Sequence, residues 1–226
     1  MCGRFALSIS PIELARQLGL PFEPDLQPRF NIAPGQDVAA VRETEGRERT
    51  FSMLRWGLVP FWARDPAIGN RMINARSETA AEKPAFKEAL RRRRCLIPAS
   101  GFFEWKTTGR SKQPFYIKPR DGFFTFAGLW ERWQSKDDGR ELLSCTILTT
   151  RPNRLVASLH DRMPVIIPRE RHADWFSRDV SQLDELFEPL SEQGLTAYAV
   201  DRAVNNVRNE SPSLIEPEHD LFGGAD

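Results

Sequence analysis

The sequence predicts an α+β fold, a single domain with a curved, barrel-like and mostly antiparallel β core flanked by short helices. Eight short segments are rich in β-branched and aromatic residues, and glycine, proline or charged clusters separate them. Four or five helical segments are distributed among them without the regular strand–helix alternation of a parallel sheet. No internal repeat or evident linker divides the 226 residues. We therefore expect residues 1–226 to form one domain with a flexible C-terminal tail over about 216–226.

The first helix is predicted to begin at Pro11. Ser10 is placed to cap it, Glu13 completes a capping box with Ser10, and proline is favoured at the first helical position. The helix then offers an apolar stripe to the core. This stripe consists of Ile12, Leu14 and Leu18.

Four prolines between residues 21 and 34 predict an extended or turning loop after this helix. The β-like segments follow at Val38–Val41, Thr50–Leu58, Cys95–Pro98, Phe102–Trp105, Phe115–Lys118, Phe123–Leu129, Leu142–Leu148 and Val165–Ile167. Further helices are predicted after Pro84, Pro152, Pro168 and Ser181.

The composition predicts a cytoplasmic protein with no membrane segment. No run of eighteen apolar residues is present, and the first residues lack the apolar stretch of a secretion signal. The three cysteines lie far apart and do not form a disulfide pattern, which indicates a reducing compartment. The sequence contains no Cys-x-x-Cys, no His-Glu-x-x-His and no glycine-rich phosphate loop. We therefore expect no metal and no cofactor.

The charge is unevenly divided along the chain. Residues 182–226 hold ten acidic and two basic residues, so this end carries −8 while residues 1–181 carry +9. A basic body with an acidic end is compatible with a polyanionic partner. The densest basic run, Arg91–Arg94, is expected to be the solvated end of a helix.

Cys2 is the residue to which the sequence draws most attention. An aminopeptidase is expected to remove Met1, because Cys2 and Gly3 are small. The product carries an α-amine, with an ordinary pKa of about 7.7–8.0, and a thiol on adjacent carbons. Such a pair can form a Schiff base with an aldehyde and then close a five-membered thiazolidine ring. The same groups also suit an acylating thiol with the amine as its base, and Cys2 can equally be an ordinary small residue.

Three further positions are candidate partners for this nucleophile. His160 lies where a helix ends and a strand begins, so it can be an acid or base or only a helix C-cap. Glu104 lies in an aromatic strand, where a raised pKa would suit it to proton transfer, unless it faces outward. Asn74 belongs to Asn-Ala-Arg-Ser-Glu-Thr, which can also be a solvated turn. His172, in a charged helical segment, is expected at the surface.

Aromatic and basic residues also indicate a nucleic-acid surface. Arg4 places a cation beside Cys2. Trp56, Trp62 and Trp105, together with Phe61 and Arg55, can form a platform on which bases stack, although aromatic residues in strands are more often part of the core.

Taken together, these motifs resemble the SOS-response-associated peptidase family along nearly the whole chain. Each motif is short, but so many in the same order are highly specific. They are Met-Cys-Gly-Arg-Phe (1–5), Arg-Phe-Asn-Ile-Ala-Pro-Gly (29–35), Leu-Arg-Trp-Gly-Leu-Val-Pro (54–60), Asn-Ala-Arg-Ser-Glu-Thr (74–79), Cys-Leu-Ile-Pro-Ala (95–99), Gly-Phe-Phe-Glu-Trp (101–105), Leu-Thr-Thr (148–150), His-Asp-Arg-Met-Pro (160–164) and Val-Asn-Asn-Val-Arg-Asn (204–209).

The resemblance implies a monomeric protein that crosslinks itself to abasic sites in single-stranded DNA and associates with the nucleoid when bound. By this analogy Cys2 forms the thiazolidine, Asn74 holds the terminal amine, Glu104 transfers protons and His160 assists sugar ring opening. The DNA-binding residues implied are Arg4, Arg76, Arg162, Phe61 and Trp62.

Other activities stay open at this point. A lyase reaction at the abasic site and a peptidase reaction that removes Met1 are both compatible with these residues. An N-terminal-nucleophile amidotransferase or hydrolase, and a non-covalent binder of single-stranded DNA, are the alternatives.

Overall fold

A closed β-barrel forms the centre of the computed structural model, which describes residues 2–44, 46–109, 111–177 and 179–218. Strand β10 pairs with both β4 and β9, and this double pairing closes the barrel. The β10–β4 pair is parallel and the other pairs are antiparallel. In order around the barrel, the strands are β4 (Arg49–Trp56), β3 (Asp37–Glu43), β6 (Arg94–Ala99), β9 (Phe124–Gln134) and β10 (Glu141–Thr150).

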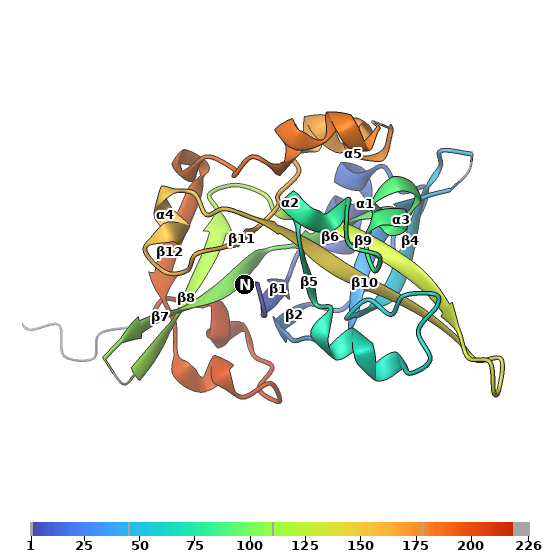
Figure 1. Ribbon diagram of the computed structural model, residues 1–226. Coiled ribbons are helices and arrows are strands. Elements are labelled where there is room, and N and C mark those ends of the chain that lie inside the picture. Colours follow the sequence, from blue (N-terminus) through green and yellow to red (C-terminus); the bar gives the residue numbers. More distant parts are fainter. Residues whose placement is uncertain (1, 45, 110, 178, 219–226) are drawn as a thin grey trace, which may run out of the picture.

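A five-stranded antiparallel sheet packs beside the barrel (Figure 1). Its strand order is β12 (Leu195–Ala199), β8 (Ser111–Pro119), β7 (Gly101–Thr108), β1 (Phe5–Leu7) and β2 (Arg29–Ile32). Two short strands, β5 (Asn74–Arg76) and β11 (Met163–Pro164), pair with β10. The predicted α+β class with a barrel-like core flanked by short helices is therefore confirmed.

Short helices cover the strands, and most are a single turn. The α-helices are α1 (Pro11–Leu18), α2 (Ser77–Ala80), α3 (Lys87–Arg92), α4 (Arg154–Ala157) and α5 (His172–Ser177). The 3-10 turns are η1 (Pro66–Arg71), η2 (Arg169–Arg171), η3 (Val180–Gln182), η4 (Asp184–Phe187), η5 (Glu192–Gly194), η6 (Arg202–Asn205) and η7 (Pro212–Ile215). None of the helices in the described residues is long and apolar enough to cross a membrane.

The start of α1 is as predicted. The Ser10 side chain accepts a hydrogen bond from the Glu13 backbone N–H, and Pro11 is the first helical residue. Leu14 and Leu18 are fully buried, but Ile12 is 61% exposed, so its assignment to the apolar stripe was wrong. Two buried side chains one turn apart are enough to attach so short a helix.

Several predictions fail where a partner distant in sequence decides the structure. The expected loop at 21–34 contains strand β2, which pairs with β1. The strand expected at Val165–Ile167 lies two residues earlier, as β11. Of the expected residues, Ile166 forms only an isolated bridge to Phe126. His172 was expected at the surface but is 2% exposed, because its Nε2 lies 2.8 Å from Thr125 Oγ1. The expected tail is described only to residue 218; residues 219–226 lie outside the described part.

The basic run Arg91–Arg94 is only partly the solvated helix end that the sequence predicts. Arg91 and Arg92 are exposed and pair with Glu88. Arg93 and Arg94 point inward, to Glu131 and to the Trp175 backbone carbonyl respectively. The last two positions of the run therefore stabilise the barrel.

Strand β1, which follows the chain start, belongs to the five-stranded sheet and packs against the barrel. Figure 1 shows β1 near the centre of the molecule. Phe5, in β1, pairs with Ile32 and Phe102 and packs its ring 5.2 Å from Trp56 and 5.8 Å from Phe126. This apolar contact fixes the position of the residues just before β1.

Candidate functional site

Cys2 lies three residues before the start of β1 and is completely buried. The side-chain amide of Asn74, in β5, donates a 2.8 Å hydrogen bond to the Cys2 backbone carbonyl. The Asn74 Oδ1 atom is buried and accepts no hydrogen bond within the described residues. Burial raises the pKa of the Cys2 thiol, and Glu104 raises it further. The thiol is therefore held in its protonated form, and a nearby base is needed to activate it.

Glu104 lies on β7, opposite Phe115 of β8, and is 2% exposed. Burial raises the pKa of Glu104 from its ordinary 4.5 to about 7, while the positive charge of the chain's amino terminus opposes this shift. The prediction of a raised pKa in an aromatic strand is confirmed, and the alternative of an outward-facing residue is wrong. A carboxyl group with a pKa near 7 can both donate and accept a proton at neutral pH.

His160 follows helix α4 and is partly exposed. Burial and the charge of the amino terminus lower the pKa of His160, whereas Asp161 raises it. The neutral ring then accepts a hydrogen bond at Nδ1 from the Arg162 backbone N–H, at 3.0 Å. The Asp161 carboxylate, 2.8 Å from the same Nδ1, becomes an ion-pair partner only when the ring is protonated. His160 Nδ1 thus has both a donor and a carboxylate within hydrogen-bond distance, so its contacts suit the neutral ring and the protonated ring alike.

Electrostatic effects connect three of these groups. The positive charge of the amino terminus lowers the pKa of Cys2, Glu104 and His160 alike, and Glu104 acts on Cys2 directly. Since Asn74 holds the Cys2 carbonyl, all four predicted catalytic residues meet around the chain start. The arrangement offers a thiol, a proton-transfer carboxyl group and an imidazole that all respond to the charge of the amino terminus, which belongs to Met1 until that residue is removed.

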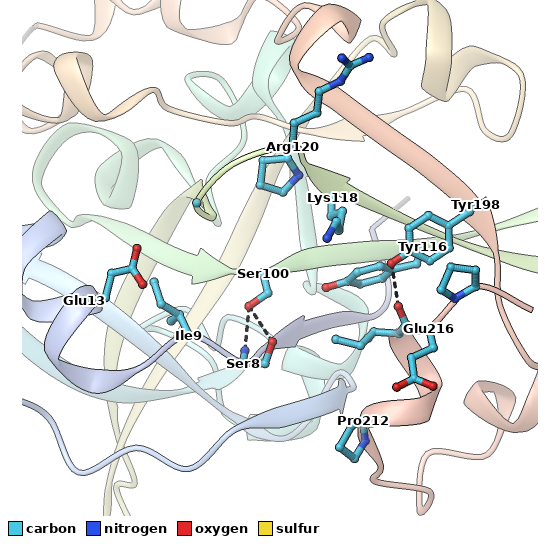
Figure 2. A pocket seen from close by; sticks show the side chains of 14 residues that line it. Ser8, Ile9, Glu13, Ser100, Tyr116, Lys118, Arg120, Tyr198, Pro212 and Glu216 are labelled. Atoms are coloured by element: carbon cyan, nitrogen blue, oxygen red, sulfur yellow. Dashed lines mark hydrogen bonds between the residues drawn. The ribbon is translucent and has the colours of Figure 1, made fainter.

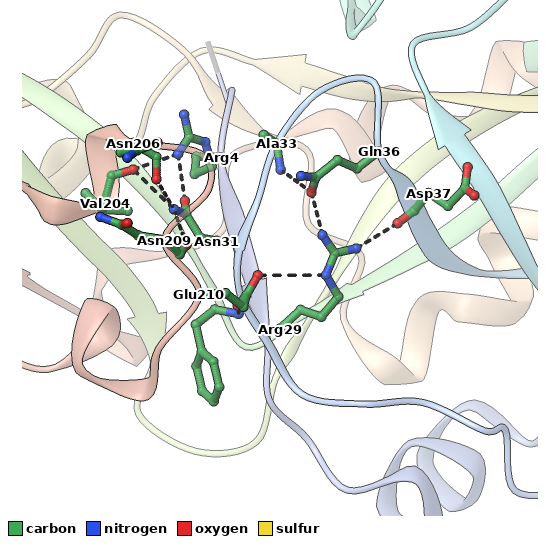
Figure 3. Close-up of polar contacts among 11 residues, drawn as sticks. Arg4, Arg29, Asn31, Ala33, Gln36, Asp37, Val204, Asn206, Asn209 and Glu210 are labelled. Carbon is green, nitrogen blue, oxygen red and sulfur yellow. Dashed lines mark hydrogen bonds and ion pairs between the residues drawn. The ribbon is translucent and has the colours of Figure 1, made fainter.

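Arg4 has internal partners rather than a free guanidinium. Its Nη1 donates to Asn31 Oδ1 at 2.6 Å and to the Val204 carbonyl at 2.7 Å. Figure 3 shows Arg4 and Asn31 facing the 204–209 segment. The guanidinium also lies 5.8 Å from the Trp105 ring. Its use as a phosphate contact stays a prediction, and its observed contacts position β1.

Asn31 is a residue whose role the sequence analysis missed. It is fully buried, and its side-chain amide donates to the carbonyls of Val204, Asn206 and Asn209. Its Oδ1 accepts from Arg4, so one side chain joins the chain start to the C-terminal segment. A lone asparagine inside the β-like Arg-Phe-Asn-Ile stretch was the available signal, since buried polar groups require partners.

Arg162 is neutralised by an ion pair. Its guanidinium makes a bidentate contact to Glu78, at 2.6 and 2.8 Å, and Nη2 also donates to the Thr149 carbonyl. The Arg162 side chain is 14% exposed and that of Glu78 is 49% exposed. The pair fixes the segment in which His160 lies.

The remaining predicted DNA-binding residues lie on the surface. Phe61 is 59% exposed and Trp62 is 48% exposed, both in a turn after β4, and Arg76 is exposed at the end of β5, directly before α2. Trp56 is fully buried against Phe5, so it belongs to the core and not to a stacking platform. Within the described residues, no group of three or more His, Cys, Asp or Glu side chains is arranged to hold a metal ion.

Comparison with known proteins identifies the family. The model of the SOS response associated peptidase (SRAP) family matches residues 1–207. The chain belongs to the SRAP family. This match covers all four predicted catalytic residues, Cys2, Asn74, Glu104 and His160.

Relatives in the family carry names that refer to DNA lesions. The chain is 41% identical to the abasic site processing protein YoqW of Bacillus subtilis, over 96% of this chain and 99% of the relative. It is 31% identical to the abasic site processing protein YedK of Escherichia coli, over 96% and 100% of the two chains. A solved structure from Bacteroides thetaiotaomicron, 27% identical, superimposes with a TM-score of 0.85 over 96% of this chain and 99% of that one.

Proposed function

We propose that this SRAP protein processes abasic sites in single-stranded DNA by joining Cys2 covalently to the ring-opened sugar. The observation that supports this proposal is the meeting of Cys2, Asn74, Glu104 and His160 around the chain's amino terminus. The names of relatives such as YoqW and YedK give the substrate class. Removal of Met1 is part of the proposal, because the reaction uses the α-amine of Cys2.

The reaction has two steps. The α-amine of Cys2 adds to the C1 aldehyde of the open sugar, and loss of one water leaves a C=N bond. The sulfur then adds to that carbon and closes a five-membered ring, while the thiol proton ends on nitrogen. The second addition is intramolecular, which gives it a large effective concentration. An internal cysteine lacks the adjacent amine and cannot form this ring.

Each neighbouring side chain has a proposed task. Glu104, with a pKa of about 7, supplies a proton for the departing water and accepts one from the buried thiol. Asn74 holds the Cys2 carbonyl and keeps the amine and thiol oriented. His160 acts as the acid that protonates the sugar oxygen during ring opening.

DNA contacts are proposed for the surface around this site. Phe61 and Trp62 are exposed aromatic rings suited to base stacking beside the lesion. Arg76 is an exposed cation two residues after Asn74 on the same strand and suits a phosphate. Arg162 and Arg4 can reach DNA only by sharing guanidinium groups already bound within the protein. A monomer that associates with the nucleoid fits this proposal.

Intact mass spectrometry with an abasic single-stranded oligonucleotide tests the proposal. We expect a species with the mass of the Met1-free protein plus the oligonucleotide minus one water, formed without reductant. Cys2→Ala should abolish it, whereas Cys145→Ala, which removes another fully buried cysteine, should not. Expression with methionine aminopeptidase inhibited gives the Met1-retaining control. Full crosslinking by that control would refute the use of the α-amine.

The same experiment addresses lyase and peptidase activity. A Schiff base acidifies the neighbouring sugar proton, so a cleaved oligonucleotide would indicate lyase activity. Loss of Met1 during incubation of the Met1-retaining protein would indicate that the thiol removes it. Hydrolysis of glutamine by the mature chain would favour the amidotransferase alternative instead.

A further inference from the structure

A cavity of about 560 Å³ lies on the five-stranded sheet at a place that the proposed function does not use. Strands β8 and β12, the residues after β1 and the C-terminal turn η7 line it, and none of Cys2, Asn74, Glu104 or His160 does. Figure 2 shows this cavity and its polar side chains. Its volume is within the range of about 300–1,000 Å³ typical of small-molecule sites.

The hydroxyl of Tyr116 is the most informative group in this cavity. Tyr116 is 1% exposed, and its hydroxyl makes no hydrogen bond within the described residues. Its neighbour Tyr198, by contrast, donates to the Ile215 carbonyl at 2.7 Å. A Cβ on Gly101 would lie 2.6 Å from the Tyr116 hydroxyl oxygen, so the hydroxyl fits only because residue 101 is a glycine. A buried hydroxyl is costly without a partner, and a ligand acceptor that reached it would remove this cost.

Ser100 contributes a second donor. Its Oγ accepts hydrogen bonds from the Ser8 backbone N–H at 2.7 Å and from the Ser8 hydroxyl at 3.2 Å. Both acceptor positions of this oxygen are therefore used, and its own O–H remains to donate. Figure 2 shows the Tyr116 hydroxyl directed toward Ser100 across the cavity, with Lys118 on the same side.

The hydroxyl donors and Lys118 favour a ligand group that is rich in hydrogen-bond acceptors. Burial raises the pKa of Tyr116, so its hydroxyl keeps its hydrogen. Lys118 adds a positive charge, and the exposed Arg120 adds another at the margin. Glu13 and Glu216 also line the cavity, and Glu216 is close enough to Tyr198 that its charge, after burial, raises the pKa of that tyrosine. Their charge disfavours a long polyanion and leaves room for one oxyanion group.

The remaining lining is apolar and accommodates the body of such a ligand. Ile9, Pro119 and Ile215 line the cavity beside the ring of Tyr198. We infer that this cavity binds a small phosphorylated molecule with a flat apolar body, of the nucleoside monophosphate class. Lys118, Tyr116 and Ser100 hold the phosphate. The site is separate from the proposed crosslinking site and does not depend on it.

Calorimetric titration of the full chain with deoxyadenosine monophosphate and with inorganic phosphate tests this site. We expect saturable binding of both, tighter for the nucleotide, at concentrations up to about 10 mM, where even a millimolar Kd approaches saturation. Tyr116→Phe should weaken binding about 10-fold. Lys118→Met should weaken it by about 10-fold or more, because it removes a charge-assisted hydrogen bond.

The controls separate a binding role from a structural one. Lys112→Met makes the same change at an exposed position of the same strand and should leave the Kd unchanged. Without ligand, Tyr116→Phe should melt at the wild-type temperature or above it, because it removes an unpaired buried hydroxyl. Because Tyr116→Phe should fold normally, its effect on the Kd still tests the site if Lys118→Met folds poorly.

Two results would overturn the inference. One is the absence of saturable binding to wild type, and the other is binding that neither Tyr116→Phe nor Lys118→Met weakens. Oligonucleotides with a 5′-phosphate or a 5′-hydroxyl identify the source of the phosphate. If only the phosphorylated end competes with the nucleotide, and Lys118→Met removes the competition, the same cavity binds a DNA terminus.

Discussion

Glu104 and Glu131 are 2% and 4% exposed, and both lie on β-strands, yet they have different kinds of counter-charge. Glu131, in β9 of the barrel, accepts a 2.8 Å hydrogen bond from the permanently charged guanidinium of Arg93. Glu104, in β7, has the chain's amino terminus as the positive charge that lowers its pKa, and burial still raises that pKa to about 7. A buried carboxylate with a permanent cation stabilises a fold, whereas one beside a titratable amine can transfer protons.

Substitution of Glu104 should have the largest effect, which is on the rate of crosslinking. Glu104→Gln keeps the shape of the side chain and removes its titration, so crosslinking to abasic DNA should slow by about 10²–10³-fold. The initial rate of adduct formation, followed on denaturing gels, measures this. Glu131→Gln is the matched control, and its rate per folded molecule should equal that of wild type. Equal rates for Glu104→Gln and wild type would remove the carboxyl group from the mechanism.

For the Arg93–Glu131 pair of the barrel, substitution should change the stability of the fold and not the rate of crosslinking. Arg93→Met leaves Glu131 buried without its cation and should cost about 3 kcal/mol in the free energy of unfolding, measured in urea. The double variant Arg93→Met/Glu131→Met should recover most of this loss, because no unpaired charge remains. If the double variant is as unstable as the single one, packing and not charge explains the pair.

The raised pKa of Glu104 predicts that the stability of the fold depends on pH. Glu104 has a folded-state pKa of about 7 against an ordinary 4.5, so the folded state binds more protons between these values. Stability should therefore be greatest below pH 4.5 as far as Glu104 is concerned, and fall by roughly 2–3 kcal/mol as pH rises to about 7. Urea unfolding of the Met1-retaining chain, compared with its Glu104→Gln variant, isolates this contribution. Parallel curves for the two proteins would contradict the raised pKa.

Local patterns were sufficient to predict the elements that depend on neighbouring residues. Ser10 and Glu13 predicted the start of α1, and the aromatic surroundings of Glu104 predicted its raised pKa. The position of Cys2 predicted the chemistry now proposed for it. For the start of α1 the cause lies within a few residues in the sequence, whereas the pKa of Glu104 is raised by burial in the assembled fold, which the aromatic strand indicated.

Elements that depend on distant partners were not predicted. Strand β2 forms inside a proline-rich segment because β1 pairs with it, and Asn31 is buried because it binds carbonyls some 173 to 178 residues away. Arg162 was predicted as a DNA contact, but its partner Glu78 lies 84 residues earlier in the chain. Burial and ion pairing of this kind are decided by the assembled fold.

Glu78 is intermediate between Glu131 and Glu104. Like Glu131 it pairs with a permanent cation, Arg162, and like Glu104 it lies near residues of the proposed reaction. The hydrogen bonds from Arg162 lower the pKa of Glu78, and half of the Glu78 side chain is exposed. Glu78→Gln should cost only about 0.5–1 kcal/mol in stability, because an exposed pair is screened by solvent. It should also release Arg162 toward DNA and tighten binding of single-stranded DNA about 3-fold at low salt.

The salt dependence of binding decides between two roles for this pair. If Arg162 gains a phosphate contact in Glu78→Gln, the slope of log K against log salt should steepen by about 0.7, the value for one phosphate of a single strand. Glu82→Gln, at an exposed position just after α2, is the control for a general loss of negative charge. If Glu78→Gln weakens DNA binding instead, the pair serves to hold Arg162 in position, and Glu78 then resembles Glu131 more than Glu104.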